Sequence, residues 1–327
     1  MNQTALFVGD TVFDTTVRVA ALPEADEKVV STDLTDALGG VATNAALACS
    51  LTGVPTTLVS SVGSDAAGQE CVAQAEKAGV GFRPEVTPGP SSRAVITIAE
   101  DGEKHLVLVP GTRMYPAEET CRHLALDDTG WLHTAVYDPV AARTLLARCA
   151  DSGVPWSVDL EPATFTDGID TLADHLDGAA TVFCNTRAAH AIGPEPERVL
   201  FALGVRSVVF TDGPHGARWC TPDEGGRQIA VPLPYAAPPV VDTTGAGDCL
   251  AGSFVGMMLE TGDPVESLRY AVTAASHSCS RYGAGSAYAS RAEVMRWYQP
   301  SGTSPSPDRA RTRAGAPGTA VRERGAS

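Results

Sequence analysis

The chain has 327 residues, of which 43% are hydrophobic and 19% charged, so it can bury the core of one large domain with a small appendage. Its formal net charge of -15 argues against a nucleic-acid partner, because a phosphate backbone is bound by surfaces rich in Lys and Arg. No apolar run approaches the roughly 18 to 20 residues of a spanning helix, and the first residues lack the basic region of a signal peptide, so we expect a soluble cytoplasmic protein with no membrane partner.

Short β-branched runs alternate with helical stretches through most of the chain. Strands are predicted at 6–8, 57–59, 157–158, 181–183 and 207–210, and helices at 44–51, 69–78, 141–150 and 196–203. This alternation predicts an α/β fold with a central, mostly parallel sheet that carries helices on both faces.

Two segments depart from the alternation. Residues 15–33 read as paired strands, one near Thr15–Val19 and one near Lys28–Val30, and residues 94–109 read as a hairpin joined through Asp101-Gly102. Together they predict a small antiparallel β flap, which in an enzyme would close over substrate and exclude water. Immobile edge strands are the alternative that the pattern leaves open.

The last part of the chain has no apolar period. Residues 299–327 combine Ser, Pro, Gly and Ala with several arginines, which predicts a disordered basic tail. The folded domain is therefore expected to span residues 1–298.

A polar constellation follows the first predicted strand. Asp14 lies shortly after it, and Gly40 and Asn44 open the next helix. Ligands of open α/β sheets bind beyond the carboxyl ends of the strands, where Asp14 and Asn44 would both lie. A carboxylate that accepts from hydroxyls and an amide that both donates and accepts suit a polyol. Taken singly, Asp14 as a loop cap and Asn44 as a helix N-cap are equally good interpretations.

The run Asp242-Thr243-Thr244-Gly245-Ala246-Gly247-Asp248 leads directly into an apolar helical segment. Its glycines allow a tight turn with outward-facing amides, and the helix adds its positive N-terminal end, so the segment predicts an anion pocket. Asp248 is placed to take a proton from a hydroxyl that attacks a phosphoryl group held there. A plain turn with an Asp N-cap is the structural alternative.

Both constellations, in this order and about 200 residues apart, resemble the two signatures of the ribokinase-like, or PfkB, family of carbohydrate kinases. The resemblance implies a ribokinase-like fold whose small β sheet is a lid that forms a homodimer. It also implies that sugar hydroxyls bind Asp14, Gly40 and Asn44, that Asp248 is the base, and that the amides of Gly245, Ala246 and Gly247 form the anion hole.

The same resemblance extends to the nucleotide and its cations. Thr211 to Gly216 resembles the family's Thr-x-Gly-x-x-Gly loop, which implies that Thr211, Gly213 and Gly216 lie near ATP, together with Asn185 of an Asn-x-x-Glu motif. Here Ala188 replaces the glutamate that helps to organise Mg²⁺ in that motif, and Glu161 is the substitute that we consider. The family's potassium site would correspond to Asp242 and Thr244.

The function implied is ATP-dependent transfer of the γ-phosphoryl group to a hydroxyl of a sugar or sugar derivative. A ketose is mildly favoured, because Ser157 to Glu161 resembles ketohexokinase-like sequences. A nucleoside kinase of the same fold is one alternative. A catalytically weak, ligand-sensing relative is another, since Ala188 removes a carboxylate, although Asp248 is retained.

Overall fold

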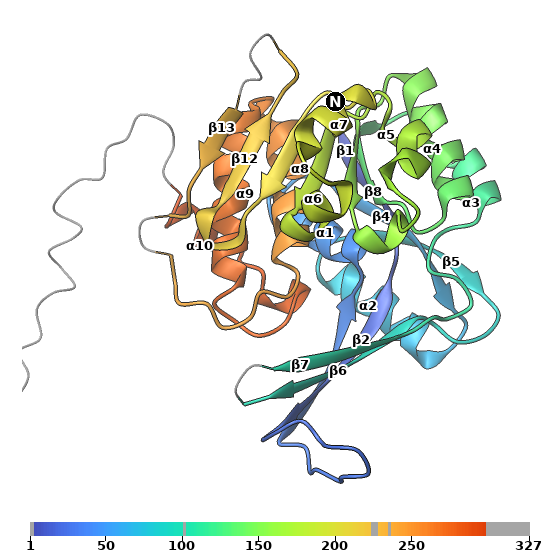
Figure 1. Ribbon diagram of the computed structural model, residues 1–327. Coiled ribbons are helices and arrows are strands. Elements are labelled where there is room, and N and C mark those ends of the chain that lie inside the picture. The colour runs from blue at the N-terminus through green and yellow to red at the C-terminus, as the bar shows by residue number, and fades with distance from the viewer. Residues whose placement is uncertain (1–2, 101–102, 224–227, 235–236, 299–327) are drawn as a thin grey trace, which may run out of the picture.

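The computed structural model (Figure 1) describes residues 3–100, 103–223, 228–234 and 237–298. Over these residues the main sheet has nine strands in the order β13-β12-β11-β10-β9-β8-β1-β4-β5. In chain order they are β1 Thr4–Gly9, β4 Thr56–Gly63, β5 Gly81–Thr87, β8 Thr129–Ala135, β9 Trp156–Leu160, β10 Thr181–Asn185, β11 Val208–Thr211, β12 Ala217–Cys220 and β13 Gln228–Val231. From β11 along this order to β5, each strand pairs in parallel with its neighbour. At the other end of the sheet, β12 pairs antiparallel with β11, and β13 pairs antiparallel with β12.

Helices cover both faces of the main sheet, as the alternation predicts. They are α1 Val41–Ser50, α2 Ala66–Lys77, α3 Glu118–His123, α4 Pro139–Ser152, α5 Ala173–Leu176, α6 Thr186–Ile192, α7 Pro196–Ala202, α8 Ala246–Thr261, α9 Pro264–Ser278 and α10 Arg291–Met295. Neighbouring residues of β1 point to opposite cores: Phe7 packs with α1, α8 and α9, and Val8 packs with α3 and α4. Burial on both faces explains why the strands read as continuous apolar runs.

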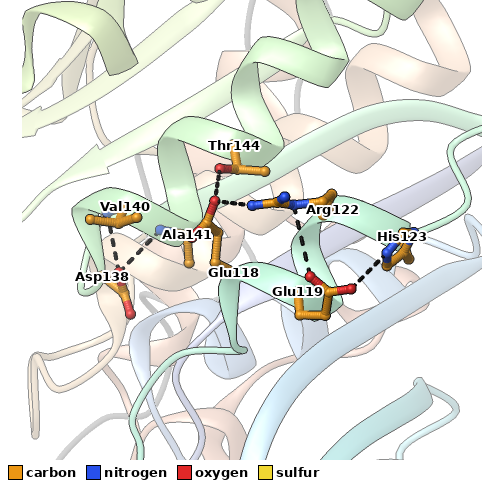
Figure 2. Close-up of polar contacts among 8 residues, drawn as sticks. All are labelled: Glu118, Glu119, Arg122, His123, Asp138, Val140, Ala141 and Thr144. Atoms are coloured by element: carbon orange, nitrogen blue, oxygen red, sulfur yellow. Dashed lines mark hydrogen bonds and ion pairs between the residues drawn. The ribbon is translucent and has the colours of Figure 1, made fainter.

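The helices α1 and α2 each begin three residues before the predicted start. Gly40 is the N-cap of α1, and Asp65 is the N-cap of α2, where its side chain accepts from the amide of Gly68. On the other face, Figure 2 shows how α3 is fixed to α4: Glu118 accepts hydrogen bonds from Arg122 and from Thr144 of α4.

A second, four-stranded sheet has the order β3-β2-β6-β7 and forms the lid sheet at the bottom of Figure 1. Its strands are β2 Val12–Val19, β3 Asp33–Gly39, β6 Arg93–Ala99 and β7 Lys104–Val109. β2–β3 and β6–β7 pair antiparallel, and the central pair β2–β6 is parallel. The lid is thus a sheet of its own, which confirms the predicted small antiparallel addition to the α/β fold.

One strand of the lid was predicted in the wrong place. The partner of β2 is β3, residues 33–39, whereas Lys28–Val30 lie outside any strand. Val30 is 88% exposed, so its apolar character reflects no buried face, and β3 continues directly into the turn before α1. The predicted turn Asp101-Gly102 and the predicted tail 299–327 lie outside the described residues.

The helices α1 and α8 approach very closely. A Cβ atom added to Gly252 would lie 1.9 Å from the carbonyl oxygen of Ala45, so only glycine permits this contact. One turn further along, Gly256 faces Thr52 in the same way. The contact brings the first turn of α1 beside the first turn of α8. Within the described residues, no helix combines the length and the apolar character that crossing a membrane would require.

Candidate active site

The two sequence constellations meet in a hydrogen bond between the first turns of α1 and α8. Asn44 Nδ2 donates to Asp248 Oδ2 at 2.8 Å, across a sequence separation of 204 residues. The side chain of Asn44 is buried, and its Oδ1 has no hydrogen-bond partner among the described residues. Asn44 is therefore not an N-cap but holds a buried acceptor that a ligand hydroxyl could satisfy.

The turn before α1 is held by Asp10, which directly follows β1. Its carboxylate accepts from the amides of Val41 and Ala42, both at 3.0 Å, and it is buried. Burial raises the pKa of Asp10, although these two amides oppose the shift. Sequence analysis assigned this residue no role, but its place at the carboxyl end of a strand was a usable signal.

Asp14 lies within β2 of the lid sheet, opposite Ala37 of β3, and not in a loop. A Cβ atom on Gly39 would be 2.1 Å from its Oδ2, so the carboxylate rests directly against this glycine. Burial, with a smaller contribution from the charge of Asp10, raises the pKa of Asp14 to about 7. The lid sheet thus carries a partly buried carboxylate that can accept a hydrogen bond from a ligand hydroxyl.

Asp248 sits among other carboxylates. Burial raises its pKa to about 7, the hydrogen bond from Asn44 opposes the shift, and the charges of Asp10, Glu161 and Asp14 add to it. A carboxylate with a pKa near neutrality accepts a proton more readily than one with an ordinary value, and it is still ionised at physiological pH to a useful extent. These are the properties of a general base.

The start of α8 has the geometry of an anion pocket. Gly245 is its N-cap in a left-handed conformation (φ 72°), and its carbonyl accepts from Tyr288 Oη at 2.7 Å. The first-turn amides of a helix have no intrahelical partner and face outward. Of the three amides predicted to form the anion hole, that of Ala246 already has a hydrogen-bond partner, because it donates to the Thr243 carbonyl at 3.2 Å.

A cavity of about 150 Å³ opens beside Asp248 at the carboxyl ends of β9, β10 and β11. It is lined by Asp159, Glu161, Phe183, Cys184, Asn185, Thr211, Thr243, Gly245, Ala246, Gly247 and Asp248. The structure therefore brings Asn185 and Thr211 of the predicted nucleotide residues to the start of α8. Gly213 and Gly216 are not among its lining residues, and Gly216 packs against the carbonyl of Val231.

Two carboxylates in this cavity lie at the carboxyl end of β9, Asp159 within the strand and Glu161 directly after it. Asp159 is 7% exposed, and its pKa is raised by burial and by the charges of Glu161 and Asp248. Burial likewise raises the pKa of Glu161. Asn185 is the N-cap of α6, where its Oδ1 accepts from the Ala188 amide at 2.9 Å.

The oxygen donors of the cavity fit Mg²⁺, which is usually held by one or two carboxylates together with phosphate oxygens. Over the described parts of the chain, no three or more His, Cys, Asp or Glu side chains are clustered closely enough to hold a metal alone. Sequence analysis considered Glu161 and overlooked Asp159, although both follow a predicted strand.

Asp242 joins the segment before α8 to the loop before residue 285. Its Oδ1 accepts from the Thr244 hydroxyl at 2.6 Å and from the Thr244 amide at 3.0 Å, and its Oδ2 accepts from the Gly283 amide at 3.0 Å. Although burial acts in the opposite direction, these bonds hold the pKa of Asp242 below its ordinary value. The segment that contains Asp242 and Thr244 is therefore in direct contact with the loop that contains Gly283.

Comparison with known proteins places this geometry in context. The model of the pfkB family of carbohydrate kinases matches residues 2–291. The chain is 29% identical to the ATP-dependent ribose-1-phosphate kinase of Halopiger xanaduensis, over 86% of this chain and 94% of that protein. It is 28% identical to the acarbose 7(IV)-phosphotransferase of an Actinoplanes species, over 89% of this chain and 97% of that protein.

The fold has solved counterparts as well. The structure of Arabidopsis thaliana ribokinase complexed with ribose and ATP superposes with a TM-score of 0.75, at 23% identity, over 91% of this chain and 99% of that one. At this identity, the likeness concerns the fold, including the large sheet and the lid sheet.

Proposed function

The chain belongs to the pfkB family of carbohydrate kinases, and from this premise we propose that it transfers the γ-phosphoryl group of ATP to a hydroxyl of a sugar or sugar derivative. The observation that carries the proposal is the 2.8 Å bond from Asn44 to Asp248. It joins the side that would bind hydroxyls to the side that would bind phosphate. A hydroxyl bound at Asn44 thereby lies beside a base and an anion pocket.

In this mechanism, Asp248 receives the proton of the attacking hydroxyl, and Asn44 fixes the orientation of its carboxylate. Asp14, Gly40 and the unpartnered Oδ1 of Asn44 bind the hydroxyls of the acceptor. Holding the acceptor in this geometry supplies much of the rate enhancement, because phosphoryl transfer depends mainly on positioning and on charge stabilisation.

The transferring phosphoryl group would lie at the start of α8. The amides of Gly245, Ala246 and Gly247 are proposed to stabilise its charge, helped by the positive end of the 16-residue helix. The rest of the nucleotide would extend along the ends of β10 and β11, past Asn185 and Thr211 and towards the turn that contains Gly213 and Gly216.

We propose that Asp159 and Glu161, with Asn185, hold Mg²⁺ in place of the carboxylate missing at Ala188. When bound, the ion neutralises phosphate charge. The two carboxylates line the same cavity as the proposed anion pocket, and burial together with neighbouring carboxylates raises the pKa of both, so a bound cation would offset this charge.

Replacing Glu161 with Gln is expected to weaken the binding of a divalent ion about 10-fold. This value is the lower end of the loss of metal affinity that follows mutation of residues around a metal site. The affinity is measured by titrating Mn²⁺ into the ADP-bound protein and following the free ion by electron paramagnetic resonance. This measurement does not require turnover. The matched control is Glu76→Gln, an exposed glutamate on α2. An unchanged Mn²⁺ affinity in the Glu161 variant would remove Glu161 from the metal site.

The acceptor is identified by a screen of ATP consumption across pentoses, ketoses, sugar phosphates, sugar acids and nucleosides. Pentoses enter because relatives are named as ribokinases and a ribose-1-phosphate kinase, and ketoses enter because of the Ser157–Glu161 run. Phosphorylation that disappears in an Asp248 variant supports the proposal. A signal with nucleosides alone indicates a nucleoside kinase, and ligand binding without phosphorylation indicates a sensor.

We further propose that a second copy of the chain covers the lid. Every residue of the edge strand β7 is exposed, and Leu106, Val107, Leu108 and Val109 each remain 44–60% exposed. Such an apolar edge strand invites pairing with another chain. Light scattering is expected to give twice the monomer mass of 33.8 kDa, and Val107→Lys is expected to reduce it to the monomer. A wild-type monomer at assay concentration would contradict this proposal.

The proposed phosphate site also includes a monovalent positive charge beside Asp242 and Thr244. This charge would lie next to the segment that carries the proposed anion-hole amides, since that segment runs without interruption into α8. The sequence-based expectation for this charge is K⁺.

A further inference from the structure

The lid reaches the phosphate-binding segment through one side chain. Lys104, the first residue of β7, donates from its Nζ to the Oγ1 of Thr244 at 2.7 Å. In Figure 1 the strands β6 and β7 lie below the loops beneath α8 and α9. This contact spans 140 residues of sequence and joins the lid sheet to the body of the molecule.

The hydrogen bonds around Thr244 have a fixed direction. An ammonium group can only donate, so the Thr244 oxygen accepts from Lys104 and uses its own proton to bond Asp242 at 2.6 Å. Asp242 then accepts the Gly283 amide with its other oxygen. The positive charge of Lys104 is thereby linked through one hydroxyl to the carboxylate that holds the two loops together, and it contributes to the low pKa of Asp242.

A second lid cation contacts the other loop of the same pair. The guanidinium carbon of Arg18, on β2, lies 3.7 Å from the ring centroid of Tyr282, the residue before Gly283. Both segments joined by Asp242 are therefore touched by a cation from the lid. Two independent contacts to one pair of loops indicate that the lid in this position is docked against them.

We propose that Lys104 is a tethered monovalent cation, whose ammonium supplies at the Thr244–Asp242 pair the charge that a free K⁺ would otherwise supply. The inference rests on the proposed kinase function and concerns how that site obtains its positive charge. Because Lys104 belongs to the lid, the charge arrives only when the lid closes. Closure over the acceptor and completion of the anion pocket then become one event.

The test compares Lys104→Met with wild type in choline chloride, KCl and NH₄Cl at equal ionic strength. Wild-type kcat is expected to change less than about 2-fold between salts. In choline chloride, Lys104→Met is expected to lose about 10-fold in kcat, as for loss of one hydrogen bond to a charged group, and to recover in KCl or NH₄Cl. Lys104→Arg keeps the charge and should retain salt-independent turnover.

The control is Lys28→Met, which removes an exposed lysine from the segment between β2 and β3 of the lid. It should behave as wild type in every salt. If wild type needs K⁺ and Lys104→Met shows the same K⁺ dependence, Lys104 is not the cation and the proposal fails.

A second readout does not require turnover. The melting temperature of the ADP-bound protein should rise on replacing choline with K⁺ in Lys104→Met and stay constant in wild type, because only the variant leaves a site for the ion. Equal responses of the two proteins would overturn the inference. This result is independent of the acceptor screen, so failure of Lys104 and failure of the kinase proposal are distinguishable.

Discussion

Replacing Asp248 with Asn is expected to lower kcat by about 10²- to 10⁴-fold, the usual contribution of a positioned general base. Asparagine has nearly the same shape and can still accept the hydrogen bond that Asn44 donates at 2.8 Å. The substitution therefore removes proton acceptance while preserving the contact between α1 and α8. The dissociation constant of ADP should stay within about 2-fold, since the nucleotide's binding groups are unaltered.

The measurement is steady-state turnover of the best acceptor from the screen, with ADP affinity determined by calorimetry. Asp151→Asn, an exposed aspartate at the end of α4, is the matched control and should retain wild-type turnover. An Asp248→Asn enzyme that kept a tenth or more of the wild-type kcat would contradict the assigned role.

The raised pKa of Asp248 also gives this residue a pH signature. Because its pKa is about 7, wild-type kcat/KM should fall as pH decreases below about 7, where the protonated carboxyl can no longer accept. For stability the sign is opposite: a carboxyl whose folded pKa is raised destabilises the fold as pH rises from about 4 through 7. Asp248→Asn should therefore melt at a higher temperature than wild type at pH 8, with the difference shrinking towards pH 4.

Replacing Asp14 with Ala is expected to lower kcat/KM by about 10²-fold, mostly through KM, since one hydrogen bond to a charged group is worth about 1.5–3 kcal/mol and a diol makes two. Asp14 is half-buried against Gly39, and its pKa is about 7, so the acceptor should also bind more weakly as pH falls below about 7.

The control for Asp14 is Asp36→Ala, on the adjacent lid strand β3. Asp36 is exposed and bonds the Thr15 hydroxyl at 2.7 Å, so its loss perturbs the lid without touching the proposed acceptor site. Acceptor KM should rise in the Asp14 variant alone. Equal KM values for both variants and wild type would show that Asp14 does not bind the acceptor.

The main sheet could be predicted because its parallel strands are buried on both faces and so appear as short apolar runs. The lid strand β3 could not, because its first four residues are exposed and three of those four are polar, and its position depends on pairing with β2. Exposed Val29 and Val30 attracted the prediction instead. A hydrophobic pattern predicts the position of a strand correctly when the strand is buried, because burial requires apolar residues. It predicts the wrong position when the strand is exposed.

The choice of Asp14, Asn44 and Asp248 as candidate site residues was predictable from residue type and from the two glycine-containing motifs, and their roles stay predictions. The hydrogen bond between Asn44 and Asp248 was not predictable, because it depends on how closely α1 packs on α8 at Gly252. Lys104 carried no signal, since an exposed lysine in a hairpin is ordinary until the structure shows what it contacts.

The glycine contact between α1 and α8 has a consequence for how such an enzyme could change its substrate. Gly252 against Ala45 fixes the proposed base, Asp248, and the amide of Asn44 on one pair of closely packed helices, whereas Asp14 comes from a separate sheet. Substitutions in the lid around Asp14 can therefore alter the proposed acceptor site without moving the proposed base. Directed evolution towards a new sugar should concentrate its mutations in the lid and leave the helix pair untouched.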